Sequence, residues 1–188
     1  MWQWVVTLRV TFVAPVIIAS LCAFASGCSN LLDITDITPA DGSAERSMSG
    51  NNFCNRAFWK ATASAGGDVP GPFGGIDGNL ATRWSTSREQ DGTDWYRVDF
   101  GGPVKLTNIT LNNSQISPND YPGGYEVYGS ADGTIIETSP FASGSGTPPT
   151  TVINFSQRTV RAVKIKQVGT TRKYQWFSIG EFQTTCDL

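Results

Sequence analysis

Apolar and polar residues alternate with a period of two in several short runs between Trp59 and Thr184. These runs, which turn-forming Gly, Asn, Asp and Pro residues separate, are residues 95–100, 105–111, 125–128, 151–155, 160–168 and 179–184. Successive side chains of a strand point to opposite faces, so each run predicts a strand with one buried face. Only residues 56–60 suggest a helical turn. The pattern therefore predicts an all-β sandwich or barrel.

Glycine-rich and proline-rich segments predict where these strands end. Gly101 and Gly102 follow the first run and are expected to stop it. The segment from Ser139 to Thr150 (SPFASGSGTPPT) has the composition of a mobile loop.

The first 27 residues are predicted to be a signal peptide. Arg9 is their only charged residue, an apolar run follows over residues 10–25, and small residues end it at 25–27. The alternative is a transmembrane anchor. A run of this length is short for a hydrocarbon core of roughly 30 Å, and Pro15 interrupts it.

Small residues immediately before Cys28 resemble the cleavage box of bacterial lipoproteins, in which the cysteine is lipidated. Ala25 stands where such boxes usually have Leu, and the alternative is an ordinary cysteine beside a plain cleavage site. Acyl chains on Cys28 would tether the exported domain to the outer surface or periplasmic face of a bacterial membrane; secretion is the alternative. Residues 28–50 are polar and irregular and predict a linker, which leaves 51–188 as the domain.

The charge balance and the absence of histidine exclude several classes of function. The chain of 188 residues has 14 Lys and Arg against 16 Asp and Glu, a net charge of −2. Without a basic excess, a protein that follows nucleic-acid phosphates is not expected. With no His at all, Ser-His-Asp and Cys-His catalysis and His-ligated zinc are impossible within this chain.

Cys54 and Cys186 stand near the two ends of the predicted domain, 132 positions apart. Export places them in an oxidising compartment, where a pair of thiols tends to form a disulfide. Two free buried thiols are the alternative. A bridge would require the two ends of the domain to lie close together.

The most specific string in the chain is GGIDGNLATRW at residues 74–84, which resembles the A-x-D-G-N-x-x-T-x-W signature of discoidin domains. This family is also called coagulation-factor C-type domains. Four further matches occur in the family's order, at residues 59–64, 95–101, 125–133 and 178–182. The resemblance covers about residues 52–187 and implies a jelly-roll β-sandwich of about eight antiparallel strands, of the galactose-binding-like, carbohydrate-binding-module type. Many members also have the terminal cysteine pair.

The Asp-Gly-Asn turn is a candidate metal site. Gly78 permits a tight turn, and the side-chain oxygens of Asp77 and Thr82 suit a hard cation such as Ca²⁺. In carbohydrate-binding relatives this turn holds a structural calcium, completed by a glutamate on the last strand. The residues that the resemblance implies as ligands are Gly74, Asp77, Asn79, Thr82, Gly180 and Glu181. The alternative is a metal-free turn closed by the Asp77 side chain.

The resemblance also places the ligand site in loops at one end of the sandwich, here residues 85–94, 112–124 and 169–177. Sugars are bound there by an aromatic face, which covers the apolar side of the ring, and by polar groups that fix the hydroxyls. The candidate ligand-binding residues are Arg88, Asn113, Asn119, Tyr121, Arg172, Tyr174 and Trp176. Trp59, Trp84 and Trp95 are expected in the core.

The sequence departs from many galactose-binding relatives, which hold ring hydroxyls with an Arg and a His. It has no His, and it has no Lys or Arg between Lys105 and Arg158, so the second loop lacks such a basic residue. Galactose specificity is therefore not expected to follow from the resemblance.

These features predict a non-catalytic, monomeric module at the cell surface that recognises a glycan or glycoconjugate and contacts the membrane only through its lipid. The alternative is a cell-adhesion or protein-interaction discoidin domain. Binding to anionic lipid through loop tips is not favoured, because the chain is acidic and the second loop has no basic residue. An enzyme is not expected either, since nothing spaces carboxylates such as Asp91 and Asp94 for glycoside hydrolysis.

Overall fold

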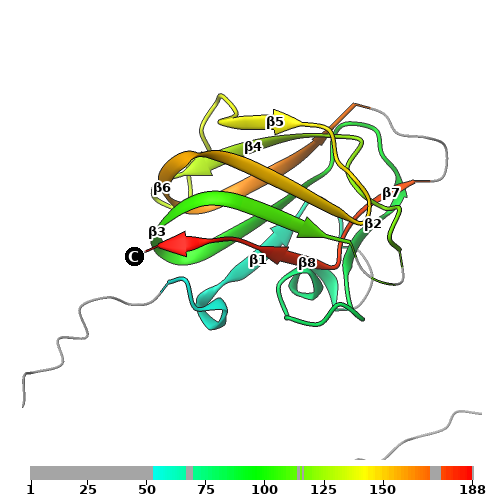
Figure 1. Cartoon of the computed structure of the whole chain (residues 1–188), viewed down its shortest axis with the longest axis horizontal. Helices are drawn as coiled ribbons and strands as arrows, with labels where there is room; N and C mark the ends of the chain where they lie inside the picture. The colour runs from blue at the N-terminus through cyan, green and yellow to red at the C-terminus, as the bar shows by residue number, and fades with distance from the viewer. Residues whose placement is uncertain (1–52, 67–69, 114, 116, 170–174, 188) are drawn as a thin grey trace, which may run out of the picture. The chain divides into compact units, whose positions relative to one another are not determined.

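The computed structural model describes residues 53–66, 70–113, 115, 117–169 and 175–187 (Figure 1). The strands in this part of the chain are β1 (Lys60–Ala63), β2 (Trp84–Glu89), β3 (Trp95–Asn112), β4 (Gly124–Ser130), β5 (Ala142–Gly144), β6 (Thr150–Val168), β7 (Trp176–Ile179), β8 (Glu181–Gln183) and β9 (Cys186–Asp187). Two short 3-10 helices, η1 (Arg56–Phe58) and η2 (Gly71–Gly75), flank β1. The first of them lies within the predicted helical turn.

The strands form an all-β, antiparallel structure, as the alternating pattern predicts. One sheet has the order β1-β3-β6-β4-β5, with β8 and β9 also paired to β3, and β2 pairs with β7 in a second, two-stranded sheet. The long strands β3 and β6 curve through the domain (Figure 1). Their two halves have different neighbours: residues 95–99 of β3 pair with β1 and the end of β6, whereas residues 105–112 pair with β8, β9 and the start of β6.

Two of the predicted strand ends are wrong. The runs at 95–100 and 105–111 belong to the single strand β3, and the runs at 151–155 and 160–168 belong to β6. Gly101 adopts a φ of 85°, which only glycine accepts easily, and the pairing of β3 with β6 shifts register between Asp99 and Val104. This glycine therefore bends the strand instead of ending it. The predicted loop 139–150 contains β5, and the first half of the predicted loop 85–94 belongs to β2.

Aromatic side chains fill the core. Trp84 is fully buried and packs against Tyr96 and Phe177, with ring centroids 5.0 and 5.2 Å away. Trp59, also buried, lies 5.2 Å from Phe100. Both confirm the prediction of core tryptophans.

Trp95 is a correction to that prediction, because its side chain lies on the outer face of the sheet. Its neighbours on β3, Tyr96 and Val98, alternate with it in burial, and Tyr96 and Val98 are fully buried. Since strand side chains alternate between faces, Trp95 must point outward, where the ammonium group of Lys164 lies 4.9 Å from its ring centroid.

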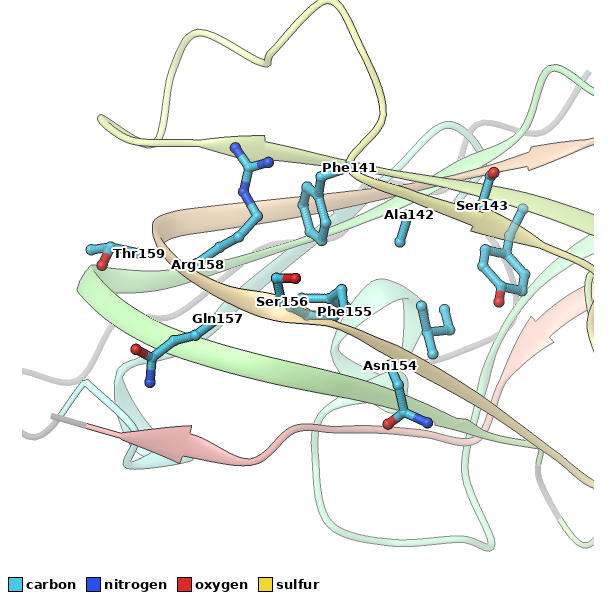
Figure 2. A pocket seen from close by; sticks show the side chains of 11 residues that line it. Phe141, Ala142, Ser143, Asn154, Phe155, Ser156, Gln157, Arg158 and Thr159 are labelled. Atoms are coloured by element: carbon cyan, nitrogen blue, oxygen red, sulfur yellow. The ribbon is translucent and has the colours of Figure 1, made fainter.

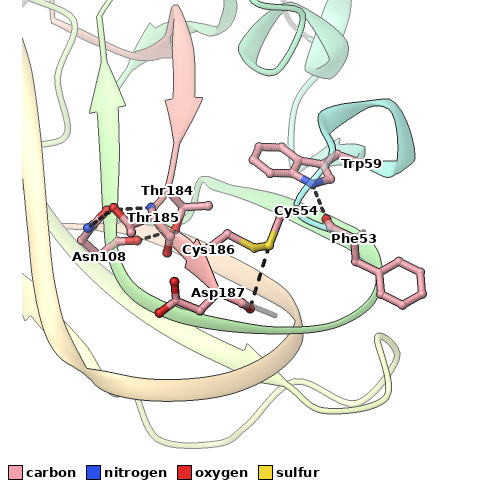
Figure 3. The surroundings of a disulfide bond; sticks show 8 residues. All are labelled: Phe53, Cys54, Trp59, Asn108, Thr184, Thr185, Cys186 and Asp187. Atoms are coloured by element: carbon pink, nitrogen blue, oxygen red, sulfur yellow. Dashed lines mark hydrogen bonds between the residues drawn. A yellow bond between two sulfur atoms is a disulfide. The ribbon is translucent and has the colours of Figure 1, made fainter. Parts of the chain in front are cut away.

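The two ends of the domain are joined by a disulfide between Cys54 and Cys186, whose Cα atoms are 5.7 Å apart (Figure 3). Strand β9 carries Cys186 to the edge of β3, where Leu106 is its partner. The chain near Cys54 is held by the indole of Trp59, which donates a hydrogen bond of 2.8 Å to the carbonyl of Phe53. The predicted cysteine pair is therefore confirmed.

The predicted signal peptide, Cys28 and the linker of residues 28–50 lie outside the described residues. Within the part of the chain that the structure describes, no helix is long and apolar enough to cross a membrane.

Candidate functional site

The buried side chain of Gln90 joins the three predicted loops at one end of the domain. Its Nε2 donates hydrogen bonds to the carbonyls of Tyr121 and Trp176, at 2.8 and 2.6 Å. Its Oε1 accepts the N–H of Gly123 at 2.9 Å. One amide on the first loop therefore fixes the backbone of the second and third loops. We call this region the loop end.

An ion pair between Arg83 and Asp120 forms a second link across the loop end. Arg83 Nη1 lies 3.3 Å from Asp120 Oδ2 and also donates to the hydroxyl of Ser117, and both charged side chains are largely buried. The guanidinium lies over the ring of Trp176, 5.7 Å from its centroid. Asp120 Oδ2 in turn accepts the hydroxyl of Ser178 at 3.2 Å. The arrangement holds the Trp176 ring next to a polar cluster.

Three of the predicted ligand-binding residues lie at this loop end. Tyr121 and Trp176 are partly exposed and share the Gln90 link, and Asn119 is exposed directly beside Asp120. Arg172 and Tyr174 lie outside the described residues.

The other two described candidates, Arg88 and Asn113, have partners of their own. Arg88 forms an ion pair with the buried carboxylate of Asp94 at 2.5 Å, which raises the pKa of the arginine, and Asp94 also accepts the hydroxyl of Ser64. Asn113 is buried, and within the described residues its Oδ1 has no hydrogen-bond partner. Its Nδ2 donates to the carbonyl of Ser178 at 3.5 Å. Arg88 therefore pairs within its own predicted loop, and Asn113 contacts the backbone of β7.

Sequence reasoning gave no particular role to Arg83, Gln90 and Asp120. Arg83 is 37 positions away from its partner Asp120, and Gln90 is 86 positions away from Trp176. No local spacing rule connects residues so far apart. Gln90 is a polar residue inside a predicted loop, and such a residue carries no sequence signal of burial. Its linking role could therefore be seen only in the folded chain.

Gln90→Ala is expected to lower the free energy of unfolding by about 1–3 kcal/mol, because it removes three hydrogen bonds and leaves buried backbone groups unpaired. Urea unfolding followed by tryptophan fluorescence measures the loss. Gln183→Ala, the same substitution at an exposed position of β8, is the control and should change the value by less than about 0.5 kcal/mol. Equal effects of the two substitutions would contradict the linking role.

The Asp77 turn brings three oxygens together. Asp77 Oδ2 lies 2.6 Å from the Thr82 hydroxyl, which is also 2.7 Å from the carbonyl oxygen of Asn79. Carboxylate, hydroxyl and carbonyl oxygens are the ligand types that a hard cation takes. The donor set at this turn therefore fits calcium.

Glu181 lies next to this turn but already has two partners. The carboxylate is 2% exposed; its Oε2 accepts the N–H of Gly78 at 2.7 Å, and its Oε1 forms an ion pair with Arg56. Among the described residues, no group of three or more His, Cys, Asp or Glu side chains could hold a metal. A metal here would thus depend on the Asp77 carboxylate together with carbonyl and hydroxyl oxygens.

The two glycines of the predicted metal site are placed by backbone packing. Gly74 lies in η2, where a Cβ atom would come within 2.7 Å of the carbonyl oxygen of Arg83. Gly180 separates β7 from β8 and donates its N–H to the carbonyl of Asn112 at 2.9 Å. Gly74 therefore allows close approach between segments that are distant in the sequence.

The antiparallel strands and their order in the two sheets define a jelly-roll domain. The sequence profile of the F5/8 type C domain matches residues 58–182. Because this match spans more than half of the chain, the chain belongs to that family, which confirms the resemblance to discoidin domains. Among curated protein sequences, none matches the chain.

Solved structures with the same fold are carbohydrate-binding modules. The CpGH89CBM32-5 module of Clostridium perfringens, in complex with GalNAc-beta-1,3-galactose, is 20% identical with a TM-score of 0.57, covering 69% of this chain and 96% of that chain. The family 32 module of NanJ from the same organism, in complex with galactose, is also 20% identical with a TM-score of 0.57, covering 69% and 94%. At this identity the likeness establishes the fold.

A third such structure comes from another organism. It is chitosan-binding module 2, in complex with chitotriose, from a chitosanase/glucanase of Paenibacillus sp. IK-5. The identity is 20% and the TM-score 0.58, and the match covers 68% of this chain and 95% of that one.

Proposed function

We propose that this chain is a non-catalytic, monomeric carbohydrate-binding module that recognises a glycan at its loop end. The observation that carries the proposal is the link made by Gln90, which holds the partly exposed aromatic residues Tyr121, between β3 and β4, and Trp176, at the start of β7. The bound sugars of its structural neighbours, galactose, GalNAc-beta-1,3-galactose and chitotriose, support the same class of ligand.

The chemistry of the loop end suits a sugar. An aromatic ring covers the apolar C–H face of a pyranose, and neighbouring polar groups bond its hydroxyls. The Trp176 ring supplies the apolar surface, and Asn119 and the Arg83–Asp120 pair supply donors and acceptors beside it. Because Arg83 and Gln90 fix these loops before the ligand arrives, less side-chain and loop entropy is lost on binding.

Trp176→Ala is expected to weaken glycan binding at least tenfold, roughly the loss of one buried aromatic contact. Affinity electrophoresis of the full chain in gels containing polysaccharide measures this, with chitosan and galactomannan as probes. Trp95→Ala removes a partly exposed tryptophan from the outer sheet face and is the matched control. No retardation of the wild-type chain by any glycan would contradict the proposed function. Capture by matrix proteins without sugar competition would support the adhesion alternative.

We also propose a structural calcium ion at the Asp77 turn. Asp77, Thr82 and Asn79 provide the clustered oxygens there, and the Glu181 carboxylate reaches the same turn through Gly78. A bound cation would stabilise the turn because it binds the folded chain and not the unfolded one. It would join the turn to β8, and it has no part in contacting the sugar.

The cell-surface location is a separate part of the proposal. Residues 1–27 have the composition of a signal peptide, and small residues precede Cys28, whose lipidation would tether the domain to a membrane. Metabolic labelling of the expressed chain with a palmitate analogue tests this, because Cys28→Ser should remove the label if the tether exists.

A further inference from the structure

A groove lies between β5 and the first half of β6, and none of the loop-end residues lines it (Figure 2). It has a volume of about 630 Å³, in the range of small-ligand sites, roughly 300–1,000 Å³. Aromatic residues of β4 and β6, and Phe141 just before β5, line it together with exposed polar residues of β5 and β6. The loop-end proposal does not use this surface.

The groove exists because the two halves of β6 have different neighbours. Residues 162–166 pair on one side with β3 and on the other side with β4. Residues 150–154 and 158–160 pair with β3 alone. Strand β5 follows β4 at the edge of the sheet, so the first half of β6 separates from it and leaves an open space between the two strands.

A bulge in β6 places three side chains, those of residues 155–157, at the centre of this groove. Leu106 of β3 pairs with Arg158, and Asn108 pairs with Asn154. Between these pairs β3 has only Thr107, whereas β6 has residues 155–157. The two extra residues interrupt the ladder of hydrogen bonds. Phe155, Ser156 and Gln157 are therefore free of the strict alternation of the strand, and all three line the groove.

The groove has an apolar floor. Phe141 and Phe155 meet edge to face with centroids 4.9 Å apart, and Tyr125 lines the groove beside them. Within the described residues, the Tyr125 hydroxyl makes no hydrogen bond, and burial raises its pKa. It therefore stays protonated at neutral pH, with a hydrogen available to a ligand.

The groove also has no net charge. Arg158 lies at one end, with its guanidinium 4.7 Å from the Phe141 centroid, and pairs with the Glu137 carboxylate at 2.6 Å. The other groove residues are uncharged: Ser143, Ser156 and Gln157 are exposed and polar. Aromatic rings surrounded by hydroxyl and amide groups are what neutral sugars require.

We propose that this groove is a second glycan site, which takes a short segment of an uncharged polysaccharide. An extended peptide could be expected to pair with the open edge of β6, but such pairing needs a regular ladder. The bulge at residues 155–157 breaks that ladder at the centre of the groove. A glycan makes no backbone ladder, so the bulge does not exclude it.

The test uses affinity electrophoresis of the full chain in gels containing the neutral polysaccharides xyloglucan, galactomannan or laminarin. Phe155→Ala removes the aromatic floor. Because that residue packs against the core, Ser156→Gln is a second variant, which narrows the groove from an exposed position. Val152→Ala, at an exposed position of β6 that does not line the groove, is the matched control. Each variant is also combined with Trp176→Ala at the loop end.

The expected result is that Trp176→Ala keeps part of the retardation on at least one neutral polysaccharide. Adding Phe155→Ala or Ser156→Gln should then weaken the remainder at least fivefold, while Val152→Ala leaves it within twofold. Loss of all retardation in Trp176→Ala alone would overturn the glycan site in the groove and support the site at the loop end. Retardation that only the groove variants remove would overturn the glycan site at the loop end and support the site in the groove. If the wild-type chain is retarded in none of the gels, the proposed glycan site in the groove is overturned.

Discussion

Replacing both Cys54 and Cys186 with serine is expected to lower the free energy of unfolding by about 2–5 kcal/mol. The bridge closes a loop across 132 positions, and a loop of that length confines the unfolded chain strongly. The two-residue strand β9 also depends on it, since Cys186 is one of only two β9 residues paired to β3. The whole loss should appear in urea unfolding of the double variant.

The control is reduction of the wild-type chain, which should reproduce most of the loss, whereas the reductant should leave the double variant unchanged. Serine is close to cysteine in size, and changing both residues leaves no unpaired thiol behind. A double variant less than about 1 kcal/mol below the oxidised wild type would contradict the prediction, because the bridge would then be constraining neither the unfolded chain nor β9.

The strands and the cysteine pair could be predicted because they depend on local signals. Alternation with a period of two marks each strand, and export favours pairing of the only two cysteines in the domain. The bends could not be predicted in the same way. A glycine at position 101 is compatible with either a turn or a bulge, and only pairing of Asp99 and Val104 with β6 decides between them.

The candidate site was predictable in outline and not in its supporting contacts. The resemblance predicts Tyr121 and Trp176 in loops; Tyr121 lies between β3 and β4, whereas Trp176 is the first residue of β7. Gln90 and Arg83 work through partners in other loops, and such contacts follow from tertiary structure and not from residue spacing. The outward direction of Trp95 was available from the sequence, however, because strict alternation with Tyr96 and Val98 requires it.

Arg56→Leu is expected to lower the free energy of unfolding by about 3–5 kcal/mol in buffer with chelator, the usual cost of leaving a buried charge without its partner. Glu181 is 2% exposed, so water cannot replace the guanidinium, and among the described residues only the N–H of Gly78 would still donate to the carboxylate. The arginine also stacks on Trp59, 5.4 Å from its centroid, and leucine keeps part of that apolar contact. Urea unfolding measures the loss.

Arg161→Leu is the matched control for this variant. It removes an arginine whose side chain is 42% exposed and whose partner Asp99 lies 3.4 Å away. Exposed pairs of this kind contribute about 0–1 kcal/mol. A loss of the same size in both variants would show that the Glu181 carboxylate does not depend on Arg56.

Calcium should rescue the Arg56→Leu chain if the Asp77 turn holds the metal. The guanidinium and the ion compete for one carboxylate, because two cations cannot share Glu181 without repulsion. Added Ca²⁺ should therefore raise the Tm of Arg56→Leu more than that of the wild type, and Asp77→Asn should remove the rise in both backgrounds. If Ca²⁺ changes neither Tm, the metal proposal fails and Arg56 is the cation that balances Glu181. If Ca²⁺ stabilises the wild type as strongly as Arg56→Leu, the ion and the guanidinium do not compete and the ligand set excludes Glu181.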